Sequence, residues 1–449
     1  MGMRHRAAPL AWGARGQYHA GPMATTPRTR RPAGPPRGEP RVRRGTVRVG
    51  GDVAWRVRAG HPWVYRDALA GRALPEPAGA EIDLVDPAGG FVARALYDPD
   101  GAIALRVFAR EPGVRLDGGT IRARVAAARR LRERLLPPSL TAYRVVHGEG
   151  DGLPGVAADR YGDFIVLQLF SAALLPLAPL VREALSATWA PRSIYEQHRF
   201  RPQTGEGPRE PAQLVAGEVA PIEVEVAEPA PPGIATGAGD APVKFVVDVT
   251  APLGTGLFLD LREGRAAVAA LAPGRRVLNL FSYTGALSIY AARGGAREVV
   301  SVDLAARAHA RARRNLQANG LGETGHEFIA GDALKVLAKM AGRGRKFDLV
   351  IVDPPSFAQA KGEVFVAQRD YRDLVAAALE VTDAGGLLAC ASNTAKLPLD
   401  DFDRILGDGG AKAKRELVVV KRRGLPADFP VPAGFPEGHY LKFEICVAS

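Results

Sequence analysis

Beyond residue 244, short apolar runs alternate with amphipathic stretches, and this alternation restricts the possible folds more than any other feature of the sequence. The apolar runs have the length of buried strands, and the stretches between them have helical spacing. Such alternation is typical of a mostly parallel, doubly wound α/β sheet, because parallel strands need a crossover connection. The predicted strands are 276–281, 298–303, 327–330, 347–353 and 386–391, and the predicted helices include 305–319 and 369–381.

Residues 45–115 are expected to form a small β-barrel ahead of this sheet. Short runs at 46–49, 81–85 and 103–108 have the length and composition of strands. Glycine pairs and Asp-Pro pairs separate these runs, as expected of turns. The sequence therefore predicts a first domain made of short strands.

Residues 116–243 are expected to form an α+β domain between the barrel and the parallel sheet. The apolar spacing predicts helices at 120–136 and 177–189, and 164–170 has the pattern of a strand. The six arginines of 120–136 form either a solvated helix face or a surface that contacts nucleic acid. A stretch rich in Pro, Gly and Ala at 228–240 predicts a linker or surface insertion, and 244–449 is the last expected domain.

The first 44 residues carry most of the positive charge. They contain ten arginines and one acidic residue, so they hold +9 of the net charge of +12. Because they are rich in Arg, Pro, Gly and Ala and have no apolar period, segment 1–44 is expected to be disordered. Two interpretations remain open: an arm that binds RNA phosphates, or an over-long start with Met23 as the true first residue.

The composition argues against several classes of protein. No apolar run approaches the ~20 residues needed to span a bilayer, so a soluble protein without a membrane partner is expected. The two cysteines, Cys390 and Cys446, belong to no CxxC pair, so neither a metal site nor a secreted disulfide framework is predicted. These features fit a reducing cytoplasm.

Three predicted strand ends carry residues suited to a ligand, because ligands of such sheets bind beyond the carboxyl ends of the strands. At the first, a buried strand runs into a tight turn whose Gly285 permits close approach of a ligand. The GxGxxG fingerprint is absent, which disfavours a nicotinamide-dependent oxidoreductase. The alternative is an ordinary strand–helix turn. The candidate residues are Asn279, Phe281, Ser282, Tyr283, Thr284 and Gly285.

Two acidic residues end the next two predicted strands. Asp303 lies 18 residues after Gly285, where a carboxylate can accept both ribose hydroxyls of an adenosyl cofactor. Asp332 is placed to accept from the adenine amino group, although it is also suited to cap a helix beginning at Ala333. The turn and the two acids together predict an adenosyl site.

The third strand end is Asp353-Pro354-Pro355-Ser356-Phe357. Two consecutive prolines stiffen the chain, and their missing N–H groups leave carbonyls free to receive donors from a planar substrate. Phe357 is suited to stack on a base, which contributes roughly 1–3 kcal/mol. A structural turn could also use this sequence, but catalysis is the favoured interpretation.

Further segments carry motifs of their own: Gly60–Tyr65, His147–Gly155, Asp159–Gly162, Gly256–Arg262 with Arg265, and Phe435–Lys442. With the strand-end motifs, they resemble the bacterial large-subunit ribosomal-RNA methyltransferase I family from about residue 45 to the C-terminus. The resemblance implies an RNA-binding PUA domain and an α+β middle domain ahead of a Rossmann-like methyltransferase domain. It also implies that S-adenosylmethionine is the cofactor, that ribosomal RNA is the partner, and that Phe258, Asp260, Arg262 and Asp353 join the cofactor site.

One position departs from the family pattern. Members that methylate C5 of cytosine carry a cysteine in a Ser-Cys-Ser element after the fifth strand, and Asn393 stands there in this chain. Ser392-Asn393 followed closely by Lys396 is similar instead to the related domain that methylates N7 of guanine. The resemblance therefore implies that Asn393 hydrogen-bonds the target base and that Lys396 contacts the base or a phosphate.

The missing cysteine matters because the two reactions differ chemically. C5 of cytosine becomes nucleophilic only after a thiolate adds to C6, whereas guanine N7 has a lone pair and needs only alignment with the methyl group. Cys390 lies in an apolar strand and is expected to be buried core, as is Cys446. Guanine N7 is therefore favoured. Cytosine C5 and a non-catalytic RNA-binding or assembly factor are the alternatives, and the oligomeric state, a homodimer included, stays open.

Overall fold

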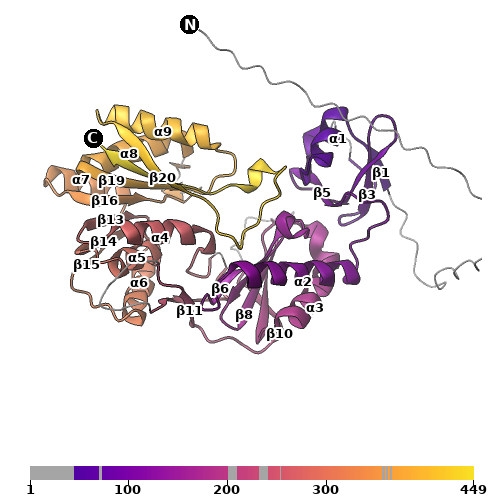
Figure 1. The fold of residues 1–449 in the computed structure, drawn as a ribbon, viewed down its shortest axis with the longest axis horizontal. Coiled ribbons are helices and arrows are strands. Elements are labelled where there is room, and N and C mark those ends of the chain that lie inside the picture. Colours follow the sequence, from indigo (N-terminus) through magenta and orange to yellow (C-terminus); the bar gives the residue numbers. More distant parts are fainter. Residues whose placement is uncertain are drawn as a thin grey trace, which may run out of the picture. The chain divides into compact units, whose positions relative to one another are not determined.

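The computed structural model describes residues 45–449 apart from 70–72, 201–209, 232–240, 253, 356–358, 361–362 and 365–366. Residues 44–449 cluster into one compact unit, shown as a ribbon in Figure 1. The basic segment 1–44 lies outside the described residues, so both interpretations of it stay open. In the described part of the chain, no helix is long and apolar enough to cross a bilayer.

A seven-stranded sheet forms the C-terminal part of the chain and confirms the predicted doubly wound architecture. The strand order is β15-β14-β13-β16-β19-β21-β20, and the first five strands are parallel. Strand β21 is antiparallel to both of its neighbours, so the edge strand β20 runs in the same direction as the first five. The strands are β13 (Arg276–Leu280), β14 (Glu298–Asp303), β15 (His326–Ala330), β16 (Phe347–Val352), β19 (Thr382–Ser392), β20 (Leu417–Arg423) and β21 (Lys442–Ala448).

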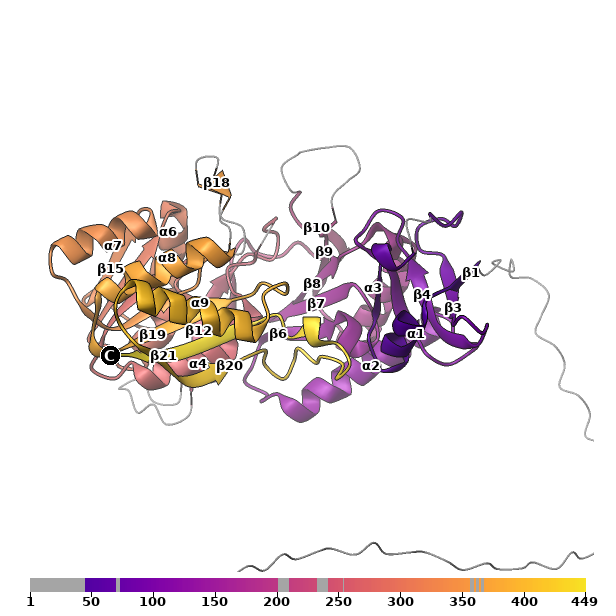
Figure 2. The same cartoon turned by 90° about the horizontal axis from the view of Figure 1, so that it is seen from above.

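Helices cover both faces of this sheet, so its central strands are buried on both faces and mostly apolar rather than alternating (Figure 1). Leu278 and Leu280 of β13 belong to the core shared with α7, α8 and α9, whereas Val277 faces the core shared with α4 and α5. The helices are α4 (Arg262–Leu271), α5 (Ala286–Arg293), α6 (Ala306–Ala318), α7 (Ala333–Gly342), α8 (Ala367–Glu380) and α9 (Leu399–Lys412). Figure 2 shows α9, β20 and β21 together at the C-terminal end.

A two-stranded sheet precedes the doubly wound sheet and crosses the predicted boundary at residue 244. Strand β11 (Val224–Glu228) pairs antiparallel with β12 (Val243–Val247) over five residues. Glu228, where the Pro/Gly/Ala stretch was expected to begin, is instead the last residue of β11 and is buried. The rest of that stretch, 232–240, lies outside the described residues.

The N-terminal strands form a five-stranded sheet in the order β1-β3-β4-β5-β2. The structure adds a helix, α1 (Gly51–Arg58), that the sequence analysis did not predict. It is only two turns long, and only Ala54 and Val57 in it are buried, so its apolar period is too short to recognise. The strands are β1 (Gly45–Arg48), β2 (Trp63–Tyr65), β3 (Glu81–Val85), β4 (Phe91–Tyr97) and β5 (Ile103–Ala109).

Between these parts, α2 (Gly118–Leu135) and α3 (Ala178–Trp189) pack against a second five-stranded sheet, in the order β10-β9-β8-β7-β6 (Figure 2). Asp117 caps α2 by accepting from the Thr120 N–H. Several arginines of α2 bind protein groups, so this helix is less available to RNA than its charge suggests; Arg132, for instance, is buried against Asp151. The strands are β6 (Ala142–His147), β7 (Val156–Tyr161), β8 (Phe164–Leu169), β9 (Ser193–His198) and β10 (Gln213–Gly217).

Candidate active site

The order in which strands are added to the doubly wound sheet reverses at β13, which lies between β14 and β16. Ligands of such sheets bind beyond the carboxyl ends of the strands at this point. The predicted residues stand there: the turn 281–285 follows β13, Asp303 ends β14, and Asp353 follows β16. The topology therefore brings together residues that lie up to 74 positions apart in the chain, from Asn279 to Asp353.

The turn after β13 has an unusual backbone. Phe281 and Tyr283 have positive φ angles of 57° and 48°, which side chains other than glycine rarely adopt. Hydrogen bonds hold this conformation: the Tyr283 N–H donates to Asp303 Oδ2 at 2.8 Å, and the Ser282 N–H donates to the Val302 carbonyl at 2.9 Å. Strained backbone of this kind persists where the surroundings impose it, often at ligand sites.

The packing and backbone conformation at position 285 explain why a glycine stands there. Its φ is 78°, and a Cβ atom there would lie 3.0 Å from the Cβ of Ala312 in α6. The glycine is therefore required by the turn and by the close packing of α6, in addition to any approach of a ligand. Thr284 is buried beside it and donates its hydroxyl to the Gly256 carbonyl.

The two strand-end acids, Asp303 and Asp332, also accept hydrogen bonds from backbone N–H groups. Asp303 accepts from the N–H groups of Tyr283 and Ala305 through its two oxygens. Asp332 caps α7 through Oδ1, which accepts from the Lys335 N–H at 3.0 Å. A carboxylate has about four acceptor positions, so each acid retains capacity for a ligand donor. The helix cap considered for Asp332 is confirmed, and it is compatible with a second role.

Among the described residues, two buried polar atoms of β13 and the turn after it have no hydrogen-bond partner. They are Oδ1 of Asn279 and Oγ of Ser282. The amide nitrogen of Asn279 is bound to the Ser288 hydroxyl at 2.8 Å, which fixes the orientation of the amide. Because an unsatisfied buried polar group costs about 1–3 kcal/mol, these atoms fit a site that a polar ligand completes.

Exposed apolar side chains accompany the acids. Leu304 follows Asp303 directly and is 67% exposed, Leu334 lies two residues after Asp332 and is 48% exposed, and Phe258 is 53% exposed. Large apolar side chains this exposed suit the faces of a planar ring such as adenine. Sequence reasoning missed both leucines, although an apolar residue soon after a strand-end acid is a signal that could have found them. The residues present therefore fit an adenosyl cofactor.

Asp353 and Asp260 form an acidic pair at the end of β16. Burial, and then the negative charge of Asp260, raise the pKa of Asp353 to about 7, against a smaller opposing effect of Arg265. Burial also raises the pKa of Asp260, whose Oδ2 accepts from the Tyr440 hydroxyl at 2.8 Å. At neutral pH, Asp353 therefore exists both as the acid and as the carboxylate.

The remaining predicted residues on this side come from two loops. Pro354 is buried and Pro355 is exposed, while Phe357 lies outside the described residues. Asn393 and Lys396 are exposed in the loop that follows β19. Lys442 of β21, opposite Ser392 in the sheet, donates from Nζ to the carbonyls of Thr394 and Leu397 in that loop, each at 2.7 Å.

Two arginines of α4 have protein partners. Arg262, predicted to bind the cofactor, is ion-paired with Asp428, and Asp428 also accepts from the Arg144 N–H at 2.8 Å. Arg265 is ion-paired with buried Glu228 and donates to the carbonyl of Phe258 at 2.6 Å. Arg262 thus binds a carboxylate that also accepts from the middle domain, and Arg265 binds the carbonyl of Phe258. Glu228 and Asp428 were not predicted, because nothing local in the sequence marks such distant partners.

Both cysteines are buried core, as expected. Cys390 in β19 and Cys446 in β21 are each 0% exposed and belong to the core under α7, α8 and α9. Burial raises the pKa of the Cys390 thiol well above its ordinary value, and burial together with Glu444 raises that of Cys446 to about 12. Neither thiol is ionised at neutral pH.

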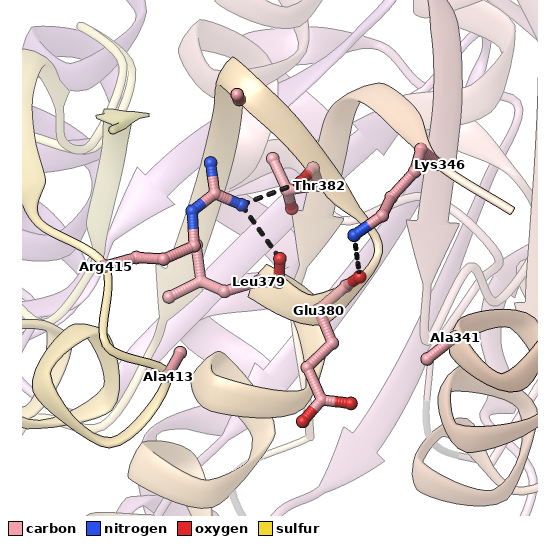
Figure 3. A pocket seen from close by; sticks show the side chains of 8 residues that line it. Ala341, Lys346, Leu379, Glu380, Thr382, Ala413 and Arg415 are labelled. Atoms are coloured by element: carbon pink, nitrogen blue, oxygen red, sulfur yellow. Dashed lines mark hydrogen bonds between the residues drawn. The ribbon is translucent and has the colours of Figure 1, made fainter. Parts of the chain in front are cut away.

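A separate pocket opens at the opposite ends of β16 and β19 and contains none of the predicted residues (Figure 3). Its two cations are committed to backbone carbonyls: Lys346 donates to Glu380, and Arg415 donates to Leu379 and Thr382. Arg415 therefore binds backbone carbonyls at the C-terminal end of α8 and at the start of β19. Among the described residues, no group of three or more His, Cys, Asp or Glu could hold a metal ion.

Comparison with known proteins identifies the family. Residues 47–110 match the model of a PUA-like domain, and residues 234–436 match that of an S-adenosylmethionine-dependent methyltransferase. Ribosomal RNA large subunit methyltransferase I of Erwinia tasmaniensis is 35% identical over 390 residues, which cover 86% of this chain and 95% of the relative. The protein of the same name from Escherichia coli O157:H7 is 34% identical over 387 residues, with 86% and 95% covered. The chain belongs to the ribosomal RNA large subunit methyltransferase I family.

Solved structures agree with this membership. A methyltransferase crystallised with S-adenosylhomocysteine has a TM-score of 0.80 and 25% identity, covering 90% of this chain and all of the other. An S-adenosylmethionine-dependent methyltransferase from Streptococcus mutans has a TM-score of 0.79 at the same identity and coverage. The predicted fold, enzyme class and cofactor are therefore confirmed: this family member is an S-adenosylmethionine-dependent methyltransferase. The individual site residues remain predictions.

Proposed function

We propose that this methyltransferase modifies N7 of a guanosine in large-subunit ribosomal RNA. The relatives from E. tasmaniensis and E. coli are named for that RNA, which supports the substrate class. The choice of base rests on Asn393, which stands where the family resemblance implies a cysteine in members that methylate cytosine C5. An amide can hydrogen-bond a base but cannot add to C6 of a pyrimidine.

No other thiol takes over that role. The whole sequence contains two cysteines, and both are buried with pKa values far above neutral. A nucleophilic cysteine needs to be a thiolate in a partly exposed, electropositive environment. Methylation at C5 would therefore lack its usual covalent step, whereas N7 needs none.

The residues of the site divide into two groups by role. The turn 281–285, with Asn279, Asp303, Asp332 and the exposed ring of Phe258, holds the cofactor, which supplies an electrophilic methyl group. Asp353, the two prolines after it, Asn393 and Lys396 face the base. Positioning the lone pair of N7 in line with that methyl group supplies the rate enhancement by proximity and orientation.

Asp353 has a further part in this reaction. Methylation at N7 makes guanine a cation, so positive charge develops on the base during transfer. An ionised Asp353 accepts hydrogen bonds from the N–H groups of guanine and, with Asp260 beside it, attracts that charge. Fixed charges that favour the charge of the transition state lower the barrier.

An RNA substrate with 7-deazaguanosine in place of guanosine tests this proposal. That analogue has a carbon at position 7, while every cytosine is unchanged. We expect the purified chain with labelled S-adenosylmethionine to label ordinary large-subunit RNA and to leave the 7-deaza RNA unlabelled. Equal labelling of both RNAs would instead favour C5 of cytosine, the alternative that family membership supports.

A further inference from the structure

The motifs Gly60–Tyr65 and Phe435–Lys442, which form no part of the cofactor site, contact each other in the structure. Residues 435–442, here called the return segment, lead from the loop after β20 into β21. Phe435 packs against Trp63 of β2, with ring centroids 4.4 Å apart. Glu437 lies 3.1 Å from His61 Nε2 and accepts from the Tyr65 hydroxyl at 3.4 Å. The start of the return segment is therefore fixed to the PUA-like domain.

The second half of the return segment reaches both sides of the target-base site. Tyr440 donates its hydroxyl to Asp260, the acid that acts electrostatically on Asp353. Lys442 donates to two carbonyls of the loop that carries Asn393 and Lys396. Tyr440 follows Glu437 by three positions, and a chain of that length spans at most about 10 Å.

Lys442 is placed at an energetic cost. Its side chain is buried, and burial lowers its pKa to about 8. Two of its three donors bind carbonyls of the loop 393–397, so a charged group is kept in the interior to hold that loop. A loop that needed only to be closed could be held by apolar packing, which costs less.

We propose that the return segment fixes the position of the target-base pocket relative to the PUA-like domain. Tyr440 and Lys442 are the positioning residues. Tyr440 fixes the position of Asp260 through a hydrogen bond, and Lys442 fixes the loop that carries Asn393 in the same way. RNA that the PUA-like domain holds is thereby kept in register with the pocket for its target base. This inference rests on the proposed function, because it takes Asn393 and Asp353 to face the base.

Substitution of Lys442 tests the first part. We expect Lys442→Gln to lower kcat for RNA methylation at least tenfold while the dissociation constant for S-adenosylmethionine, measured by calorimetry, changes less than twofold. Lys442→Arg keeps a charged donor and is expected to restore part of the rate. Lys339→Gln, at an exposed lysine of α7, is the matched control and should leave both quantities unchanged. A parallel loss of cofactor affinity would reduce Lys442 to a general structural role.

A double-mutant cycle tests the connection to the PUA-like domain. Glu437→Gln should lower kcat by a factor of about three to ten, with Glu416→Gln, at an exposed glutamate, as the control. We expect the effect of Glu437→Gln to shrink in the Lys442→Gln background, because both act through one segment. Effects that multiply independently would overturn the proposal. Since kcat is measured whichever base is labelled, this outcome is distinct from a failure of the N7 assignment.

Discussion

At the scale of single residues, Asp353 combines a cost to the fold with a role in the reaction. The pKa of about 7 means that the folded protein binds this proton more tightly than the unfolded chain, where the ordinary value is 3.8. Burial of Asp353 therefore destabilises the fold progressively as the pH rises from about 4 to 7. Charge kept at such a cost is common at catalytic sites.

The first prediction concerns the pH dependence of methylation. If the carboxylate of Asp353 stabilises the developing charge, the rate at saturating substrates should rise about tenfold per pH unit below 7 and level off above it. The Asp353→Asn variant should methylate RNA slowly, and its rate should not rise with pH in this range. A wild-type rate that falls as the pH rises through 7 would show that the protonated acid is the active form.

The second prediction is that Asp353→Asn, which should lower activity, raises the stability of the fold. Asp353→Asn removes a buried charge, so its melting temperature should exceed that of the wild type at pH 8. Below pH 4 both proteins carry a neutral group at this position, so the difference should vanish. Scanning calorimetry at the two pH values measures it, and equal melting temperatures at pH 8 would contradict the pKa shift.

Strand-end residues could be predicted from the sequence because their signals are local. Asp303, Asp332 and Asp353 each end or follow an apolar run, and the doubly wound topology then brings those ends together. Partners from distant parts of the chain could not be predicted this way. Lys442 lies in a recognised motif, but its bond to the loop of Asn393 depends on the pairing of β19 with β21.

At the scale of elements, the side chain of Asp303 is one of the groups that hold the turn after β13. Asp303 accepts from the N–H of Tyr283, whose φ is 48°. We predict that Asp303→Ala weakens binding of S-adenosylmethionine at least tenfold, because the turn relaxes and an acceptor for the ribose is lost. Calorimetry is the measurement. Asp408→Ala, at an exposed acid of α9, is the control, and unchanged affinity in Asp303→Ala would exclude Asp303 from the cofactor site.

The contact between β11 and α4 carries a second prediction at this scale. The ion pair of Glu228 with Arg265 is fully buried, and Tyr290 also donates to Glu228 at 2.8 Å. Glu228→Gln would leave the charge of Arg265 uncompensated, so we expect the free energy of unfolding to fall by about 3–5 kcal/mol. Urea denaturation measures this.

An exposed pair of α2 provides the control for that experiment. Arg129 and Glu133 form an ion pair with both side chains about half exposed. Glu133→Gln should change stability by no more than about 0.5 kcal/mol. Similar losses in the two variants would contradict a special role of the Glu228–Arg265 pair in joining β11 to α4.

The elements themselves were predictable where the apolar period is long. Strands β13, β14, β15, β16 and β19 and helices α2, α3, α6 and α8 agree with the predicted ranges to within a few residues. Helix α1 was missed because two turns give too short a period, and β20 because its alternation is weak, with Val418 and Val420 exposed at the sheet edge.

At the scale of the whole molecule, residues 45–449 contain two domains that contact each other. The PUA-like domain and the methyltransferase domain match separate family models, and the return segment contacts His61 of the first and Asp260 of the second. A single enzyme therefore contains both a surface for RNA and a site for the methyl donor. The sequence located both domains, but the contact between their motifs required the three-dimensional structure.

The most direct test of the central claim is the identity of the methylated nucleoside. The purified chain is incubated with isotope-labelled S-adenosylmethionine and unmodified large-subunit ribosomal RNA, and the RNA is then digested and analysed by mass spectrometry. An enzyme that uses Asn393 and no thiolate should place the label in 7-methylguanosine. Label in 5-methylcytidine would contradict the claim and would require a nucleophile other than the two buried cysteines as they lie in this structure.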